Sequence, residues 1–367
     1  MTVMIAQHMA AALAPFQGED LLSRESLARI AHEVAGHLPA AMTRYFGFEC
    51  RLGDALPTAD FVLRIDGPGE QWQALEQYAS VRDAPAWGRI GSFVAGRNDP
   101  QSAWRGCIDN MWLEFDLASR DGRALPSVFF GTDRLVAREG VSLAFEWVKA
   151  SISALQGRPL QPVRARVLGA IVAALPPGAQ IFQVGMMLSR ADAPLRICVG
   201  DVAAEGIADF LNAVGWPGPI ASVERALHEA APFMSHMAVG LDVGDDGVTK
   251  KLGLEIYAGG HAGAGQRLLG LIRLLAGAGF LLPGKAAGLL AWDGITHQRL
   301  HAQQWPADLL AEKAACGTQD SSAFVRWINH FKLGFDGDRT PVAKAYLAVS
   351  HRLLTNRAIR EAMRQTT

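Results

Sequence analysis

Several short segments that alternate apolar and polar residues carry side chains able to hold an anion, move a proton and shield a cation. The clearest are Lys344-Ala345-Tyr346, Glu255-Ile256-Tyr257 and Trp112-Leu113-Glu114-Phe115-Asp116. Converging Lys and Arg side chains bind phosphate groups, a carboxylate transfers protons, and aromatic faces attract cations. What these residues can do together depends on the elements that position them.

The alternating segments come in five closely spaced pairs, and each pair is typical of an antiparallel hairpin. Asp121-Gly122 and Gly244-Asp245-Asp246-Gly247 are turn signals within two of them. Because five hairpins are too many to lie flat, we predict an α+β fold with a closed ten-stranded antiparallel barrel, built from five αββα repeats with helices outside and a polar lumen. The predicted pairs are 46–51 with 61–65, 111–117 with 126–131, 180–189 with 194–200, 236–243 with 250–257, and 326–334 with 343–349.

The whole chain, 1–367, is predicted to be one domain with its core at about 20–360, because no linker rich in Pro, Gly or Ser divides it. The alternatives are an open α+β sheet, or two smaller domains that split near residue 160 or 220. Helices are predicted at 20–43, 69–97, 143–155, 162–175, 203–214 and 221–231, with two or three more within 266–315 and a short one from about 352.

Strand side chains alternate between two faces, so the non-apolar parity of each hairpin is assigned to the lumen. A sheet with one solvated face is the alternative, but the aromatic members of the set favour an enclosed face. The basic members leave two hypotheses open, namely pairing with the lumen carboxylates or convergence on a phosphate or diphosphate. The charged and aromatic members are Glu49, Arg51, Arg64, Trp112, Glu114, Asp116, Phe129, Arg196, His236, Asp242, Lys251, Glu255, Tyr257, His330, Lys332, Lys344 and Tyr346, with Gln183 beside them.

The overall charge and composition exclude some classes of partner. The net charge is -1, from 35 basic and 36 acidic residues, so neither nucleic acid nor an anionic membrane is expected. The N-terminus lacks the basic region of a signal peptide, and Arg273 and Lys285 interrupt the most apolar stretch, 268–292. We therefore expect a cytoplasmic protein. Gly279–Ala286 matches GxxxxGK but follows a helix, so a helix-turn-helix connection is favoured over a phosphate loop.

With these features the chain distantly resembles the aromatic prenyltransferases of the αββα (ABBA) barrel type, and most closely their indole branch. The architectural likeness covers about residues 20–360. That branch carries Lys-x-Tyr on lumen strands, as in Lys344-Ala345-Tyr346, and Lys251 with Tyr257 is a looser match. It also places a Glu and an Arg on the two strands of the first hairpin, which Glu49 and Arg64 resemble.

The resemblance implies that the chain transfers a prenyl group from an allylic diphosphate to an aromatic acceptor, either a small molecule or a peptide side chain, in secondary metabolism. It implies that Glu49 is the base, with Glu114 as its rival. The implied diphosphate ligands are Arg64, Arg196, Lys251, Lys332 and Lys344. The implied cation shield is Trp112, Tyr257 and Tyr346, and the other lumen residues are Asp116, Gln183, His236, Glu255 and His330.

The chain departs from the family pattern in ways that keep a second hypothesis open. Only four tyrosines occur, two of them expected outside the lumen, and Ser127-Val128-Phe129 stands where Lys-x-Tyr is expected. No DDxxD signature occurs, so no cofactor is expected, although Glu114 and Asp116 could hold a magnesium ion. The alternative function is a non-catalytic barrel protein that binds a peptide or a small metabolite in a natural-product pathway.

Overall fold

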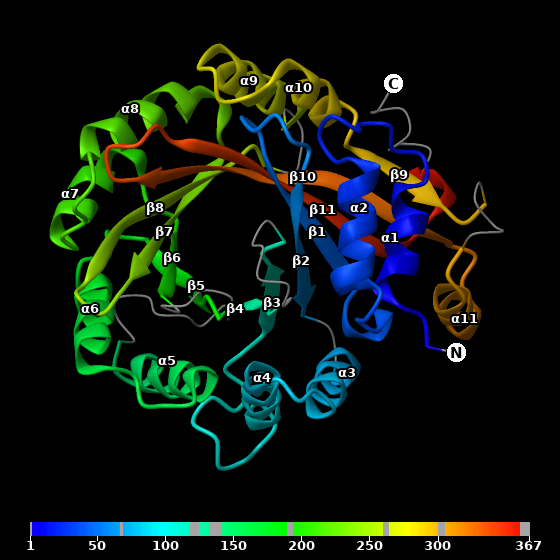
Figure 1. Cartoon of the computed structure of the whole chain (residues 1–367), viewed down its shortest axis with the longest axis horizontal. Coiled ribbons are helices and arrows are strands. Elements are labelled where there is room, and N and C mark those ends of the chain that lie inside the picture. The colour runs from blue at the N-terminus through cyan, green and yellow to red at the C-terminus, as the bar shows by residue number, and fades with distance from the viewer. Residues whose placement is uncertain are drawn as a thin grey trace.

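Ten antiparallel strands close into a barrel around a single lumen. The structure, a computed structural model, describes residues 2–66, 69–117, 125–131, 141–188, 194–259, 264–299 and 305–359. Within these ranges the strand order is β11-β1-β2-β3-β4-β5-β6-β7-β8-β10, and pairing of β10 with β11 closes the ring. Figure 1 looks into this ring and shows the helices on its outside. The predicted α+β barrel of αββα repeats is confirmed.

All five predicted hairpins form, and their observed bounds differ from the predicted ones by a few residues. Asp121-Gly122 lies outside the described residues. The prediction was wrong at Gly294–His297, which forms a strand within a region predicted to be helical, and at 352–354, where β11 continues. The strands are β1 Tyr45–Arg51, β2 Ala59–Ile65, β3 Asn110–Phe115, β4 Ser127–Gly131, β5 Gln180–Met186, β6 Leu195–Gly200, β7 His236–Val243, β8 Val248–Tyr257, β9 Gly294–His297, β10 Ser321–Asp336 and β11 Val342–Leu354.

The helices lie between the hairpins, and the predicted helix over 20–43 is shorter and interrupted. Ser23 caps it, because its side chain accepts a hydrogen bond from the Ser26 amide. A π-helical turn, Ala31–Ala35, ends it. The α-helices are α1 Ile5–Leu13, α2 Arg24–Ile30, α3 Gly69–Ser80, α4 Pro85–Gly96, α5 Val141–Gln156, α6 Pro162–Ala173, α7 Ile207–Ala213, α8 Ile220–Ala230, α9 Ala264–Gly277, α10 Pro283–Leu290 and α11 Ala307–Cys316.

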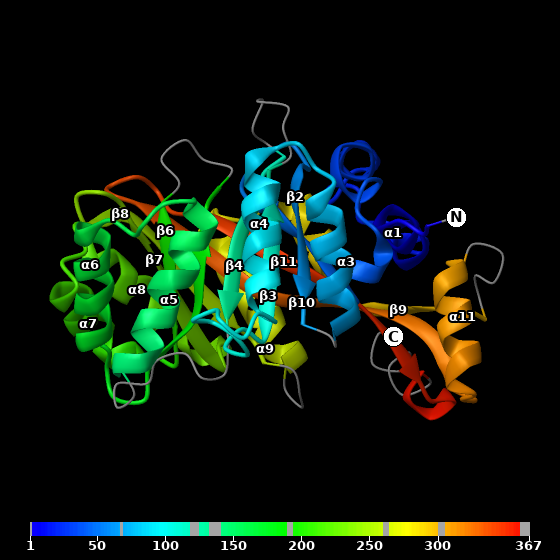
Figure 2. The same ribbon diagram turned by 90° about the horizontal axis from the view of Figure 1, so that it is seen from below.

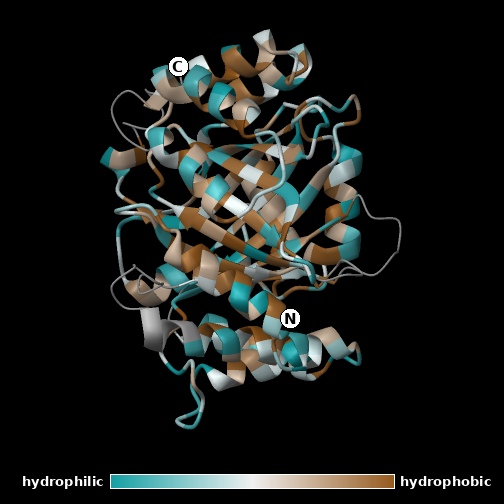
Figure 3. Cartoon of the chain, turned by 90° about the vertical axis from the view of Figure 1, so that its left-hand side faces the viewer, coloured by the Kyte–Doolittle hydropathy of each residue, from teal (hydrophilic) through white to brown (hydrophobic). Residues whose placement is uncertain are grey.

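The hydrophobic core is the layer between the barrel and its helices. Phe48, Leu63 and Leu113 come from the apolar parity of their strands and are fully buried there. Each such side chain stabilises the fold by roughly 1.5–3 kcal/mol. Brown and teal residues alternate along the elements in Figure 3, as this division of faces requires. Ile5 and Met9 of α1 also belong to this hydrophobic core.

The β10–β11 ribbon is longer than the barrel wall and continues past it. Its outer part, Ala323–Arg326, pairs with β9, and Figures 1 and 2 show this extension beside α1 and α11. Contacts far apart in sequence hold it, since the His8 imidazole lies 2.8 Å from Asp308 and the Thr296 hydroxyl donates to the Ala12 carbonyl. The ribbon thus joins the lumen wall to a small outer sheet.

The GxxxxGK match is a connection between two helices, as predicted. Gly279–Ala286 links α9 to α10, and the Lys285 side chain is buried. Its ammonium group donates to the carbonyls of Arg51 and Leu56, the latter at 3.1 Å. Lys285 therefore fixes the turn between β1 and β2. Among the described residues, no helix has the length and apolarity needed to span a membrane.

Candidate active site in the barrel lumen

The lumen contains a cavity of about 220 Å³, close to the lower end of ligand sites, which occupy roughly 300–1,000 Å³. Tyr45 starts β1, Asn110 starts β3 and Tyr257 ends β8, so the cavity lies toward the end of the barrel opposite the hairpin turns. Its lining residues are Tyr45, Val62, Arg64, Asn110, Trp112, Glu114, Phe129, Phe182, Gln183, Arg196, Cys198, Glu255, Tyr257, Asn329, His330, Lys332, Tyr346 and Leu347.

Most of the predicted site residues line this cavity, and five do not. Glu49 and Lys344 lie further down the barrel and contact the lining residue Tyr346 or each other. Lys251 is exposed near the β7–β8 turn, where β8 has passed beyond the enclosed lumen. Asp116 follows the end of β3, and His236 is exposed at the start of β7. Parity does not show how far the cavity extends along a strand.

Glu255 is the centre of one charged network in the cavity wall. Its two carboxylate oxygens accept hydrogen bonds from the Lys332 ammonium and the Tyr257 hydroxyl, each at 3.0 Å. Burial alone would raise the pKa of Glu255, but the Lys332 charge, His330 and the hydrogen bonds from Lys332 and Tyr257 together outweigh burial and lower that pKa to about 2. Burial would lower the pKa of Lys332, but Glu255 stabilises the ammonium form and the pKa is raised. The pair is therefore ionised throughout the neutral range.

A second network lies deeper and involves the Lys-x-Tyr segment. The Lys344 ammonium and the Tyr346 hydroxyl both donate to the Glu49 carboxylate. Burial would raise the pKa of Glu49, but Lys344 and these hydrogen bonds lower it to about 2. Glu49 is therefore held as a fully engaged carboxylate, which is a poor proton acceptor at neutral pH.

The two arginines of the lining also have carboxylate neighbours. The Arg196 guanidinium donates to both oxygens of buried Asp242, at 2.7 and 3.1 Å, and Arg64 Nε lies 3.1 Å from Asp66. Arg64, Arg196, Lys332 and Lys344 thus each lie beside a carboxylate, as the first of the two hypotheses for the basic lumen residues predicts. Buried charges need such partners, because an unpaired ion in a dry interior carries a large desolvation penalty.

Glu114 differs from the other lumen carboxylates. It lines the cavity, and in the described part of the chain it accepts no hydrogen bond and forms no ion pair. Burial, reinforced by the negative charge of Glu49, raises the pKa of Glu114 to about 7, although Lys332 and Arg196 oppose the shift. A carboxyl group with a pKa near the working pH is suited to proton transfer. The surroundings of Glu114 are therefore better suited to proton transfer than those of Glu49.

A column of four rings forms one side of the lumen. His236 stacks on Tyr257 at 4.3 Å, Tyr257 lies 4.9 Å from His330, and His330 stacks on Tyr346 at 4.2 Å. Burial lowers the pKa of His330 to about 4, so its imidazole is neutral near pH 7. The histidines thus extend the aromatic wall that two tyrosines alone could not complete.

Tyr45 and Asp60 are lumen residues that the sequence analysis missed. Tyr45 lines the cavity with its ring 5.1 Å from that of Trp112, so only Tyr78 lies outside the lumen. Asp60 is buried 3.7 Å from Arg51. Both have the parity of predicted lumen residues, but the first hairpin was predicted to begin at 46 and its second strand at 61. Strands longer by one residue would have included them.

Two glycines leave room for large side chains in the lumen. A Cβ atom on Gly253 would lie 2.3 Å from the Lys332 side chain, and one on Gly185 would lie 2.1 Å from the Phe129 ring. Both distances are shorter than a van der Waals contact. The absence of a side chain at Gly253 and Gly185 therefore lets the Lys332 and Phe129 side chains lie across the neighbouring strands.

Metal ligands are not clustered in the described ranges. They contain no group of three or more His, Cys, Asp or Glu side chains placed to hold an ion. Glu114 lies on β3 and Asp116 just beyond its end, but they are only two carboxylates, whereas magnesium sites require near-octahedral oxygen coordination. Independence from metal stays a prediction.

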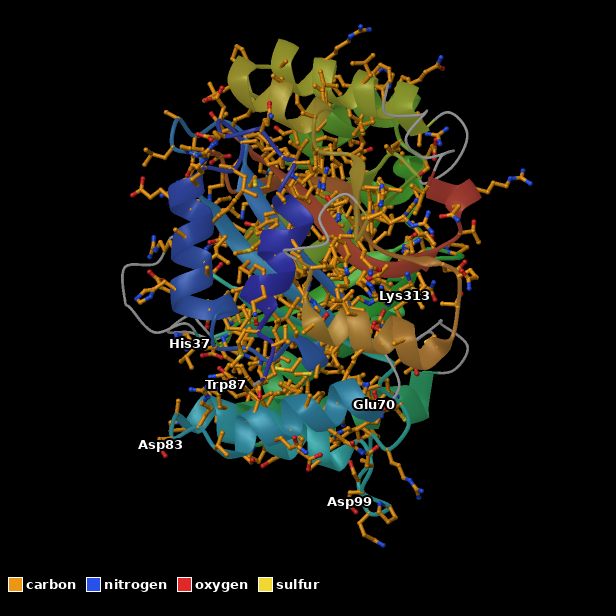
Figure 4. All side chains as sticks on the ribbon, turned by 90° about the vertical axis from the view of Figure 1, so that its right-hand side faces the viewer. His37, Glu70, Asp83, Trp87, Asp99 and Lys313 are labelled. Carbon is orange, nitrogen blue, oxygen red and sulfur yellow. The ribbon has the colours of Figure 1, made fainter. Side chains whose placement is uncertain are left out.

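A second cavity, of about 210 Å³, lies outside the barrel between the π-helical turn and the α3–α4 pair. Figure 4 labels His37 and Trp87 at this position. The Arg82 guanidinium covers the Tyr78 ring at 4.3 Å, and Glu33 is paired with Arg29. These groups already satisfy one another, so the lumen remains the candidate site.

Comparison with solved structures identifies the fold. No protein-family model and no curated protein matches the sequence. The apo crystal structure of the prenyltransferase PriB matches with a TM-score of 0.53 and 13% identity, over 95% of this chain and 96% of that chain. Its ternary complex with L-tryptophan and dimethylallyl thiolodiphosphate matches over the same shares, with a TM-score of 0.52 and 14% identity. This chain has the fold of PriB. The resemblance to αββα-barrel prenyltransferases is thus confirmed at the level of fold.

Proposed function

We propose that the chain transfers a prenyl group from an allylic diphosphate to an aromatic acceptor inside the lumen. The observation that carries the proposal is the make-up of the cavity, in which Glu114 faces cationic donors and an aromatic wall. The proposal draws further support from the shared fold with PriB, one structure of which contains L-tryptophan and dimethylallyl thiolodiphosphate. A barrel of this fold encloses a reaction that must be kept from water.

The first step breaks the bond between the allylic carbon and the bridging oxygen, and the electron pair leaves with the diphosphate. Preorganised cations and N–H donors stabilise the departing charge. Two buried nitrogen atoms of the lining form no hydrogen bond among the described residues, namely Arg64 Nε and His330 Nε2. Asn329 Nδ2 lies 3.2 Å from His330 Nδ1, so an amide that donates there leaves the proton on Nε2. His330 Nε2 is therefore available to the diphosphate, whereas Arg64 Nε lies 3.1 Å from the Asp66 carboxylate and would exchange that partner for the diphosphate.

The resulting allyl cation needs shielding until the acceptor attacks it. The faces of Tyr257, Tyr346 and Trp112 attract a cation through their π-electrons, by about 0.5–2 kcal/mol each. A protonated imidazole in the column would repel the allyl cation, which is why the lowered pKa of His330 matters.

In the second step the acceptor ring supplies an electron pair to form the new carbon–carbon bond, and the ring becomes cationic. The Glu114 carboxylate then takes the proton from the substituted carbon, and the aromatic system is restored. General-base catalysis of this kind contributes typically 10²–10⁴-fold to a rate.

The test is incubation of the purified protein with dimethylallyl or geranyl diphosphate and a panel of indoles, phenols and aromatic peptides, with products detected by mass spectrometry. A product heavier by one prenyl group, lost in Glu114→Gln but retained in Glu224→Gln on the surface of α8, supports the proposal. Failure to bind a non-hydrolysable analogue of either diphosphate would overturn it.

The pairing of the lumen cations favours a second candidate, a barrel that binds a peptide or small metabolite without transfer. Lys332, Arg196 and Lys344 each contact a carboxylate already, so a diphosphate must compete with protein anions. In this case Lys344→Ala would leave ligand affinity unchanged while Glu114→Ala would abolish it. Detection of any prenylated product excludes this candidate.

A further inference from the structure

A continuous series of rings and guanidinium groups leads from the cavity to its outside. Within the cavity, Arg64 lies over the Trp112 ring at 5.4 Å, and Trp112 contacts Tyr45 at 5.1 Å. Tyr45 then meets Trp327 edge-on at 5.6 Å, and the Arg352 guanidinium lies over Trp327 at 5.6 Å. Trp327 and Arg352 do not line the cavity. The series therefore extends the aromatic wall beyond the enclosed site.

The outer members of the series lie on the β10–β11 ribbon where it leaves the barrel. The bulge between Ile328 and His330 shifts the register, so Trp327 pairs with Ala348 and Val325 pairs with Ser350 on the face that continues the lumen wall. Tyr45 pairs with Ser350 from the other side. We call Tyr45, Val325, Trp327, Ser350 and Arg352 the mouth shelf. All of them are partly or fully exposed.

The opposite face of the same ribbon is already covered. Phe324 is buried in contact with the rings of His8 and Trp305, and the His351 ring packs against it at 5.6 Å. The ribbon is thus fixed from behind by α1 and by the segment that precedes α11. Among the described residues of this ribbon segment, the mouth shelf is the face that stays exposed, and it has a rigid support.

Arg352 is the one shelf residue with a charge, and in the described part of the chain it has no acidic partner. This sets it apart from Arg64 and Arg196, each of which lies beside a carboxylate. Its guanidinium is exposed and stacked on an indole. A stacked guanidinium keeps its edge donors for a planar anion, above all a carboxylate.

We propose that the acceptor is a short peptide, whose aromatic side chain enters the cavity while its backbone lies on the mouth shelf and a carboxylate binds Arg352. The proposal rests on the proposed function, since it specifies the acceptor of that reaction. The path from the cavity to Arg352 argues for a peptide, because it runs from the cavity-lining Tyr45 ring to Trp327 and then to the Arg352 guanidinium, with 5.6 Å at each step. A free aromatic amino acid with its ring in the cavity is too short to reach from one end to the other.

The experiment compares L-tryptophan with peptides that extend tryptophan by two or by four residues. Each peptide is made in two forms, one that ends in glutamate and carries carboxylates, and one that ends in glutamine amide and carries none. Each is assayed for prenylation with dimethylallyl diphosphate, and each is also assayed for direct binding by calorimetry. The variants are Arg352→Gln, Arg352→Lys and the control Arg339→Gln. Arg339 is an exposed arginine near the opposite end of the same ribbon, so its replacement removes the same charge far from the shelf.

We expect KM to fall with peptide length and with a terminal carboxylate, and Arg352→Gln to raise KM for the acidic peptides about tenfold without changing kcat. Arg352→Lys should recover part of this loss, and Arg339→Gln should have no effect. Prenylation of L-tryptophan that is as efficient as that of every peptide, and insensitive to Arg352→Gln, would overturn the inference but leave the proposed function intact. Binding of peptides that depends on Arg352 in the absence of any transfer would instead overturn the proposed function.

Discussion

Replacement of Glu114 by glutamine should make the folded protein more stable while it removes the proposed base. The pKa of Glu114 is raised from 4.5 to about 7, so between these values the folded state binds more protons than the unfolded state. Stability therefore falls as pH rises through this window, and the full penalty is present above pH 7. Glutamine cannot ionise, so the variant avoids that penalty.

The magnitude follows from the size of the shift. About 2.5 pKa units at about 1.4 kcal/mol per unit correspond to about 3 kcal/mol. Linkage predicts that Glu114→Gln gains about 3 kcal/mol in free energy of unfolding at pH 8 and less than about 1 kcal/mol at pH 5. Glu224→Gln, which changes an exposed residue on α8, should gain nothing at either pH.

The assay is denaturant unfolding of both variants and the parent protein at pH 5 and pH 8, with prenyl transfer measured on the same samples. We expect Glu114→Gln to be more stable at pH 8 and slower in transfer by roughly 10²–10⁴-fold. If Glu114→Gln has the same free energy of unfolding as the parent protein at both pH values and keeps full activity, the raised pKa of Glu114 and its role as base are both refuted. If Glu114→Gln is less stable than the parent protein at pH 8, Glu114 must be ionised and well paired, contrary to the structure.

Three further predictions concern the wall of the cavity. Lys332→Met should destabilise the protein by about 3–5 kcal/mol in denaturant unfolding, because Glu255 would remain buried without its partner; the double variant Lys332→Met/Glu255→Gln should recover most of this loss. His330→Phe should abolish a rise in stability between about pH 4 and pH 6.5, where only the unfolded chain binds the imidazole proton. Lys285→Met should lower stability by roughly 1–3 kcal/mol without changing KM, because the carbonyls of Arg51 and Leu56, outside the cavity lining, lose a charged donor.

The barrel was predictable from the sequence because its two faces have opposite polarity. Residues such as Phe48 and Glu49 alternate on each strand, and that alternation alone assigns one face to the helices and the other to the lumen. Strand β9 was not predictable in this way. It has four residues, Gly294–His297, too few for a period of two to be distinguished from the helices around it.

Most residues that line the cavity were predictable from the sequence, but which of them pair with an opposite charge was not. Which carboxylate meets which cation depends on the register between strands that are distant in sequence, as for Lys344 beside Glu49 or Lys332 beside Glu255. Parity carries no information on that register. It also does not show where a strand leaves the enclosed lumen, so Lys251 was assigned to the site although it is exposed.

The lumen consists of two parts with different chemistry, and Glu114 connects them. The deeper ion pairs, such as Lys344 with Glu49, stay ionised over a wide pH range and fix the wall. The upper cavity offers Glu114, Arg64 Nε and His330 Nε2, which have no hydrogen-bond partner among the described residues. An anionic donor is repelled least when Glu114 is protonated, whereas removal of a proton from the acceptor requires its carboxylate. A pKa of about 7 makes both forms accessible at the same pH, as both steps require.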